Sequence, residues 1–172
     1  TPYATYGLIG ANVLAWALLQ GFGVEPALSS SVCRLGLVPA DVLGTVPPGT
    51  RFPISPEAAC VLEGGGSWHT VLTSMFLHGG WMHLGGNMLY LWIFGDNLEK
   101  VMGAARFVIF YLASGFAAAM AQAYADPAST IPMIGASGAI GGVLGAYLLL
   151  FPRAHVLVLI PLGVFGATVA LG

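Results

Sequence analysis

Charged side chains are scarce in this chain. Asp, Glu, Lys and Arg make up only 7% of its 172 residues, while 57% are hydrophobic. A soluble domain is about a quarter charged. This composition excludes an ordinary soluble domain and predicts an integral membrane protein.

Basic residues are few. Five Lys and Arg against seven Asp and Glu give a net charge of −2, so the chain lacks the basic face that a nucleic-acid partner requires. It also lacks the basic amphipathic helix of a protein that lies on a membrane surface. We therefore expect membrane lipid around the chain and no nucleic acid as a partner.

Cysteine is nearly absent. Cys33 and Cys60 are the two in the chain, and their spacing resembles no metal site. Both fall in the long polar segment 25–70, where a disulfide would form in an oxidising compartment. The sequence leaves their pairing open and favours two free thiols.

Long apolar runs account for most of the rest of the chain. Because about 20 apolar residues cross a bilayer, these runs predict an all-α, polytopic membrane helical bundle with five helical spans, the fifth of them incomplete. We expect residues 1–172 to form a single transmembrane domain that is truncated at its C-terminus. The five predicted spans are Tyr6–Val24, Trp81–Leu98, Phe107–Ala123, Ser137–Phe151 and Val156–Leu171.

The basic residues predict how the bundle is oriented. Lys100 and Arg106 lie in the second connection and Arg153 in the fourth, whereas the third connection has none. Short cytoplasmic loops are enriched in Lys and Arg. The long segment 25–70 and the entrance to the span that begins at Ser137 are therefore predicted on the outer, non-cytoplasmic side.

Three polar residues lie where a bilayer would penalise them: His83, Asn87 and Ser137. Ser137 begins an apolar run after a turn-like segment, so we expect it in the first turn of a helix, where free N–H groups favour developing negative charge. His83 and Asn87 are four residues apart and share one helix face. A serine with two such donors nearby suits nucleophilic attack with a stabilised oxyanion.

Each of these signals also has a structural interpretation. Small residues around Ser137 are common where membrane helices pack tightly, and His83 with Asn87 suits a polar clamp between helices. We interpret Asp96 and Glu99 as structural residues at a helix end. Three side-chain amides are interpreted as interhelical hydrogen bonders, namely Asn12, Gln20 and Gln122.

The segment from His78 to Asn87 resembles the His-x4-His-x3-Asn motif of the rhomboid intramembrane serine proteases. Gly135-Ala136-Ser137-Gly138 resembles their Gly-x-Ser-Gly motif, with matching order and spacing. The resemblance runs from about Tyr6 to the end of the chain. It differs at His69, where the family has an arginine after the tryptophan, and at Gly141, where some members have a tyrosine.

This resemblance implies a function and a set of roles. Ser137 would be the nucleophile, and His83, Asn87 and the Ser137 backbone N–H would form the oxyanion hole. Gly135 would permit close approach, and His78 would be the structural histidine above the site. The expected activity is cleavage of transmembrane-helix protein substrates, without metal or cofactor, at a site that opens to the outer side.

A general base for Ser137 is missing from the sequence. Rhomboids supply it as a histidine from a sixth helix, whereas this chain has only His155 after the serine. The intervening helix rises roughly 20 Å at about 1.5 Å per residue, so we expect His155 at the opposite membrane face. The base histidine is therefore predicted outside this chain, which alone should be inactive.

Two other functions remain open. One is a non-catalytic rhomboid-like protein that binds transmembrane clients, which would need none of Ser137, His83 and Asn87. The other is a small transporter, for which we find neither an internal repeat nor polar groups at the midplane. The sequence leaves the oligomeric state undetermined.

Overall fold

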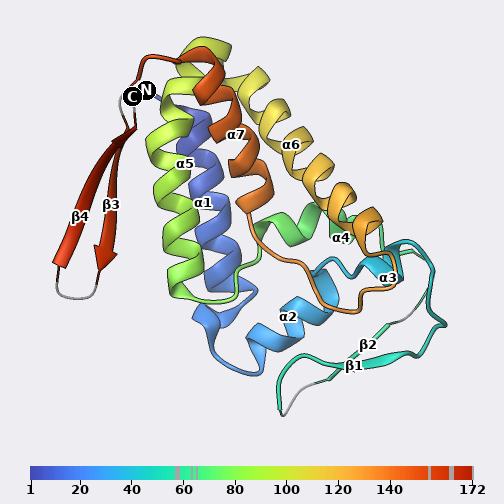
Figure 1. Ribbon diagram of the computed structural model, residues 1–172. Coiled ribbons are helices and arrows are strands. Elements are labelled where there is room, and N and C mark those ends of the chain that lie inside the picture. Colours follow the sequence, from blue (N-terminus) through green and yellow to red (C-terminus); the bar gives the residue numbers. More distant parts are fainter. Residues whose placement is uncertain (57–58, 63, 65, 155, 163–164, 172) are drawn as a thin grey trace.

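A computed structural model describes residues 1–172 except 57–58, 63, 65, 155, 163–164 and 172 (Figure 1). Within the described residues, the longest helices run side by side as a bundle, in agreement with the predicted mainly helical fold. These helices are α1 (Tyr3–Leu18), α5 (Trp81–Met102), α6 (Ala104–Ala125) and α7 (Ser137–Leu150).

The long segment between α1 and α5 is folded and lies at one end of the bundle (Figure 1). A disulfide between Cys33 and Cys60 joins its helix α2 to its strand β2, with Cα atoms 5.3 Å apart. The expectation of free thiols is therefore wrong, because the fold brings together two residues that the sequence separates. The elements of this segment are η1 (Gly21–Gly23), α2 (Ala27–Leu35), α3 (Pro39–Val42), β1 (Arg51–Pro53), β2 (Ala59–Val61), α4 (His69–Thr73) and η2 (Ser74–Phe76).

Small residues let α6 and α7 approach closely. A Cβ atom on Gly138 would lie 2.7 Å from the Cβ of Ala118, and one on Gly142 would overlap Ser114. Glycine at these positions therefore serves helix packing, as expected between membrane helices. The buried side chains of the bundle include Leu91, Phe94, Leu98, Phe107, Tyr111, Ala139 and Val143.

The first predicted span, Tyr6–Val24, is longer than the helix that forms. Helix α1 ends at Leu18 after 16 residues, roughly 24 Å of helix. The chain then turns through η1, where Gly21, Phe22 and Gly23 all have positive φ. A Cβ on Gly23 would overlap the ring of Trp16, so this glycine turn follows from tight packing against α1.

The predicted fifth helical span, Val156–Leu171, is wrong. Strand β3 (Val156–Leu162) pairs antiparallel with β4 (Phe165–Leu171), with Val156 opposite Leu171. Alternating β-branched residues favour a strand, and Pro161 lacks the N–H that a helix would use. Hydropathy alone does not distinguish a helix from a strand in a run this short.

Membrane-crossing potential is clearest for α6. Among the described residues, it is the helix that is long and apolar enough to cross a membrane, and α7 is a shorter apolar helix. Helix α5 is as long as α6 but carries Asp96, Glu99 and Lys100 near its end. The predicted number of five spans is therefore not confirmed.

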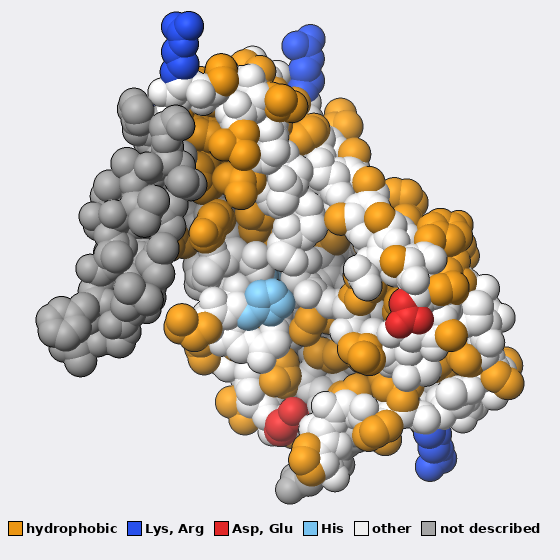
Figure 2. Space-filling model, in the orientation of Figure 1, with side chains coloured by type: hydrophobic (Ala, Val, Ile, Leu, Met, Phe, Trp, Pro, Cys, Tyr) orange, Lys and Arg blue, Asp and Glu red, His pale blue; other side chains and the backbone are white. Residues whose placement is uncertain are grey.

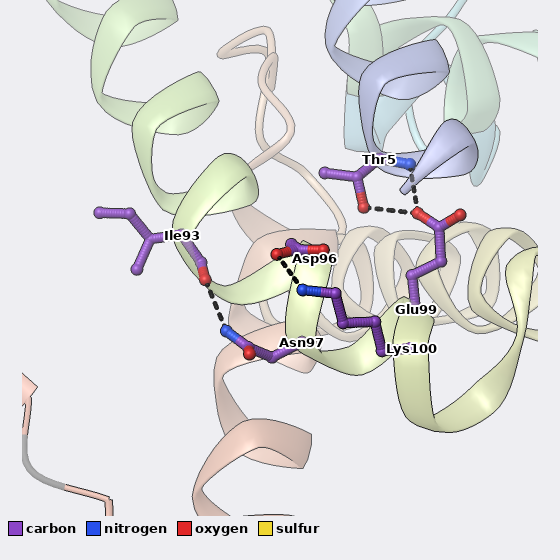
Figure 3. Close-up of polar contacts among 6 residues, drawn as sticks. All are labelled: Thr5, Ile93, Asp96, Asn97, Glu99 and Lys100. Atoms are coloured by element: carbon purple, nitrogen blue, oxygen red, sulfur yellow. Dashed lines mark hydrogen bonds and ion pairs between the residues drawn. The ribbon is translucent and has the colours of Figure 1, made fainter. Parts of the chain in front are cut away.

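Glu99 connects α5 to the N-terminus of α1 (Figure 3). Its carboxylate accepts hydrogen bonds from the backbone N–H groups of Ala4 (2.9 Å) and Thr5 (2.7 Å) and from the Thr5 hydroxyl (2.8 Å). Helix α1 has no side-chain cap of its own, and a carboxylate at a helix N-terminus satisfies free N–H groups and the dipole. Glu99 is buried, so this is a structural contact between two helices.

Replacing Glu99 should therefore destabilise the bundle. We expect Glu99→Gln to lower the free energy of unfolding by about 2–3 kcal/mol, because hydrogen bonds to a charged, buried acceptor are lost. Unfolding in detergent micelles, followed by helical circular dichroism, measures this. The control is Asp96→Asn, which removes the exposed ion pair with Lys100 (2.7 Å) and should cost less than about 1 kcal/mol. Equal effects of the two substitutions would contradict the assignment.

Candidate active site

Ser137 is the first residue of α7, as the sequence predicted, and its side chain is exposed. Three backbone hydrogen bonds hold the chain that leads to it: Gly135 N–H donates to Ser74 O (2.9 Å), and Leu37 and Met133 each donate an N–H to the carbonyl of the other. The Ser137 backbone N–H donates to no other described residue. The helix therefore begins with a free donor beside a reachable hydroxyl.

His83 lies in the first turn of α5 and is half-buried. A Cβ atom built on Gly135 would lie 2.8 Å from His83 Nε2 and 3.7 Å from Ser137 Oγ. The imidazole and the hydroxyl thus both lie close to residue 135, and the imidazole can approach because this residue has no side chain. Gly135 also has a φ of +121°, a conformation that favours glycine.

The other imidazole nitrogen of His83 is already occupied. Its Nδ1 accepts a hydrogen bond from the backbone N–H of Gly79 at 3.2 Å. An accepting nitrogen carries no proton, so the neutral ring has its proton on Nε2. His83 therefore presents a donor to the space beside Ser137.

Asn87 lies one turn further along α5 and is buried. Its Nδ2 has no hydrogen-bond partner in the part of the chain that the structure describes. Buried side-chain amides are normally hydrogen-bonded, so a free amide on the helix that packs against α7 is a donor that a bound group could use.

His78 is fully buried next to His83. The two ring centroids are 5.1 Å apart at an interplanar angle of 67°, and neither His78 ring nitrogen has a partner among the described residues. Burial, with a smaller effect of the His83 imidazole, lowers the pKa of His78 to about 4. His78 is therefore neutral near pH 7.

A cavity of about 210 Å³ adjoins Ser137 on the side of α6. Neither His83 nor Asn87 is among the residues that line this cavity. The small residues of α6 and α7 leave this space between the two helices. Its lining includes Ser74, Gly115, Gln122, Gly135, Ser137 and Gly138.

Two contributors were not identified from the sequence as parts of the site. The Gly79 N–H was not predicted, because a backbone donor cannot be recognised from the types of side chain in the sequence. Gln20 was expected to bond another helix, but it bonds the backbone of His78. Asn12 bonds within its own helix, to Leu8 O (2.8 Å). A glycine pair before a helix, as at Gly79 and Gly80, is the signal that could have indicated a tight turn.

His155, which the sequence predicts at the opposite membrane face from Ser137, lies outside the described residues. Within the ranges described, no group of three or more His, Cys, Asp and Glu side chains could hold a metal ion.

Comparison with known proteins decides the family. Residues 65–172 match the family model of the Rhomboid domain. The chain belongs to the rhomboid family. The match begins at residue 65 rather than near Tyr6, and members of this family are integral membrane proteins.

Several curated proteins resemble the chain. Over 83 residues it is 43% identical to rhomboid protease GluP of Bacillus subtilis, covering 48% of this chain and 16% of GluP. Over 95 residues it is 37% identical to mitochondrial rhomboid protein 1 of Saccharomyces cerevisiae, covering 53% and 28%. Over 87 residues it is 31% identical to inactive rhomboid protein 1 of Drosophila melanogaster, covering 51% and 6%. The chain thus spans well under half the length of these relatives.

A side chain at residue 135 should disturb this rhomboid site. Gly135→Ala would place a methyl group against His83 and would force a non-glycine residue to positive φ, at a cost of about 1–3 kcal/mol. The melting temperature in detergent measures the loss. Gly141→Ala is the control, because a Cβ there meets nothing within 4 Å. A fully stable Gly135→Ala protein would contradict the geometry.

Acidification should destabilise the fold through His78. Its pKa is about 4 in the folded chain against 6.5 for the ordinary side chain, so the stability it contributes is complete above pH 6.5 and is lost as the pH falls toward 4. The expected loss by pH 5 is about 2 kcal/mol. Unfolding measured between pH 7 and 5 tests this. His78→Asn should flatten the profile, and His69→Gln, at an exposed position, should leave it unchanged.

Proposed function

We propose that the chain forms a single rhomboid-like transmembrane domain within an intramembrane serine endopeptidase, with Ser137 as its nucleophile. The observation that carries this proposal is the close approach of His83 Nε2 and Ser137 Oγ to Gly135, whose lack of a side chain lets an imidazole and a hydroxyl lie near one backbone position. A packing serine needs no hydrogen-bond donor near its hydroxyl, whereas a nucleophile needs one within reach of the carbonyl oxygen that it attacks.

The oxyanion is stabilised by three donors in this proposal. The backbone N–H of Ser137 is free at the N-terminus of α7, His83 carries its proton on Nε2, and Asn87 Nδ2 has no described partner. Donors held in place before reaction stabilise negative charge as it develops on the carbonyl oxygen. As Ser137 Oγ bonds to the carbonyl carbon, the oxygen of that carbonyl takes up the negative charge.

The base that removes the Ser137 proton is proposed to be a histidine outside these 172 residues. His83 Nδ1 is occupied by Gly79, and its Nε2–H is needed as a donor. The base passes its proton to the leaving amine as the C–N bond breaks, and water then hydrolyses the acyl-enzyme. Because this base is proposed elsewhere, activity is expected of the full-length protein.

The proposed substrates are proteins with a transmembrane helix, cut at a site that opens to the outer side of the membrane. A helix holds its carbonyl groups in internal hydrogen bonds, so the substrate must unwind locally before attack. The proposed chemistry uses no metal and no cofactor.

Covalent labelling of the full-length protein tests the nucleophile. A fluorophosphonate probe should modify Ser137, as located by mass spectrometry, and Ser137→Ala should abolish both the label and cleavage of a transmembrane substrate. The matched control is Ser74→Ala, because Ser74 lines the same cavity and should keep the label in place. A folded, full-length protein that takes no label would refute the protease proposal.

A non-catalytic role is the second candidate, favoured by the 31% identity with an inactive rhomboid protein. Such a protein would bind transmembrane clients without attacking them. It would give no fluorophosphonate adduct, and Ser137→Ala would bind a transmembrane helix as tightly as the unmodified chain does.

A further inference from the structure

Gln20 lies where α1 meets the turn before α5. It is fully buried, and its side-chain amide makes two hydrogen bonds with one peptide backbone: Nε2 donates to His78 O (2.7 Å), and Oε1 accepts from His78 N–H (2.8 Å). The two residues are 58 positions apart in the chain. A two-point contact of this kind holds both the position and the direction of the backbone that it binds.

The turn held by Gln20 leads directly to His83. Gly79 follows His78, and its N–H is the group that donates to His83 Nδ1. The rings of Trp81 and Trp16, 5.5 Å apart and edge to face, keep the start of α5 against α1. The direction of the Gly79 N–H therefore depends on the backbone that Gln20 holds.

We propose that Gln20 is a positioning residue for the oxyanion hole: it fixes the turn at His78 and Gly79 so that His83 keeps one tautomer, with Nδ1 accepting and Nε2–H directed to the space beside Ser137. The inference rests on the proposed role of His83. Without the Gly79 donor, the two neutral tautomers of an imidazole become available, and one of them presents a lone pair instead of a donor to the developing oxyanion.

The tautomer can be read without any activity. In full-length protein with ¹⁵N-labelled histidine, NMR in micelles should show His83 with unprotonated Nδ1 and protonated Nε2. Gln20→Met, similar in size but without the amide, should give a mixture of tautomers. The control is Asn12→Leu, which removes a buried side-chain amide of α1 whose Nδ2 donates to Leu8 O, and which should keep the single tautomer.

Two outcomes of the NMR experiment overturn the proposal. One is a single, unchanged tautomer in folded Gln20→Met, and the other is the same mixture in Asn12→Leu. If Gln20→Met fails to fold, Gln20→Glu replaces it, because the carboxylate still accepts from His78 N–H but donates nothing to His78 O. An unchanged tautomer in that variant also counts against the proposal.

Kinetics on the full-length protein provide the second arm. Gln20→Met should lower kcat at least about tenfold, within the roughly 100- to 1,000-fold loss that follows removal of an oxyanion donor, with KM nearly unchanged. Gly79→Pro, which removes the N–H that donates to His83 Nδ1, should lower kcat in the same way. Asn12→Leu, the control of the NMR experiment, should keep its kcat.

The two arms separate the two proposals. If the full-length protein neither cleaves nor labels, the protease proposal fails, while the tautomer measurement still decides the role of Gln20. If Gln20→Met cleaves normally although its His83 is a mixture of tautomers, catalysis does not need a fixed proton on His83. The inference about Gln20 then fails, while the protease proposal stands.

Discussion

The contact between α1 and α5 is the constraint on which the site depends. At one end, the Glu99 carboxylate of α5 caps the free N–H groups of α1. At the other end, Gln20 after α1 binds the turn before α5. Because both contacts are buried, breaking either leaves unpaired polar groups in an apolar setting, where they cost the most. The two helices are therefore held together at both ends, and His83 is held with them.

The site itself arises where three backbone features meet. Helix α7 begins at Ser137 with a free N–H, His83 lies in the first turn of α5, and the loop from α6 into α7 passes through Gly135. Each feature is common alone. Their combination brings a donor, a hydroxyl and a glycine backbone to one point, and the fold builds this point from segments more than 50 residues apart in the sequence.

The surface of the molecule agrees with a membrane environment for the bundle. Figure 2 shows hydrophobic side chains spread over the visible face, with Lys and Arg side chains projecting at its two opposite ends. Such a distribution is typical of helices whose sides contact lipid and whose ends contact water. Large apolar side chains such as those of Met82 and Leu149 are exposed on the surface of the chain, which suits contact with lipid.

The membrane character, three of the helices and the family could be predicted from the sequence alone. Scarce charge predicted a membrane protein, apolar runs predicted α5, α6 and α7, and the two polar motifs indicated the family to which residues 65–172 belong. These properties depend on composition and short spacings. The fifth run is the exception, because apolar character suits a strand as well as a helix, and strand pairing decided between them.

Tertiary structure alone decided what depends on neighbours distant in the chain. The Cys33–Cys60 disulfide, the partner of Gln20 and the proton position on His83 all follow from groups that approach only after folding. A buried amide in a sequence indicates that a partner exists, but not which one, since any backbone group can satisfy it. The candidate residues of the site were proposed from the sequence, whereas the contacts that orient them could be seen only in the fold.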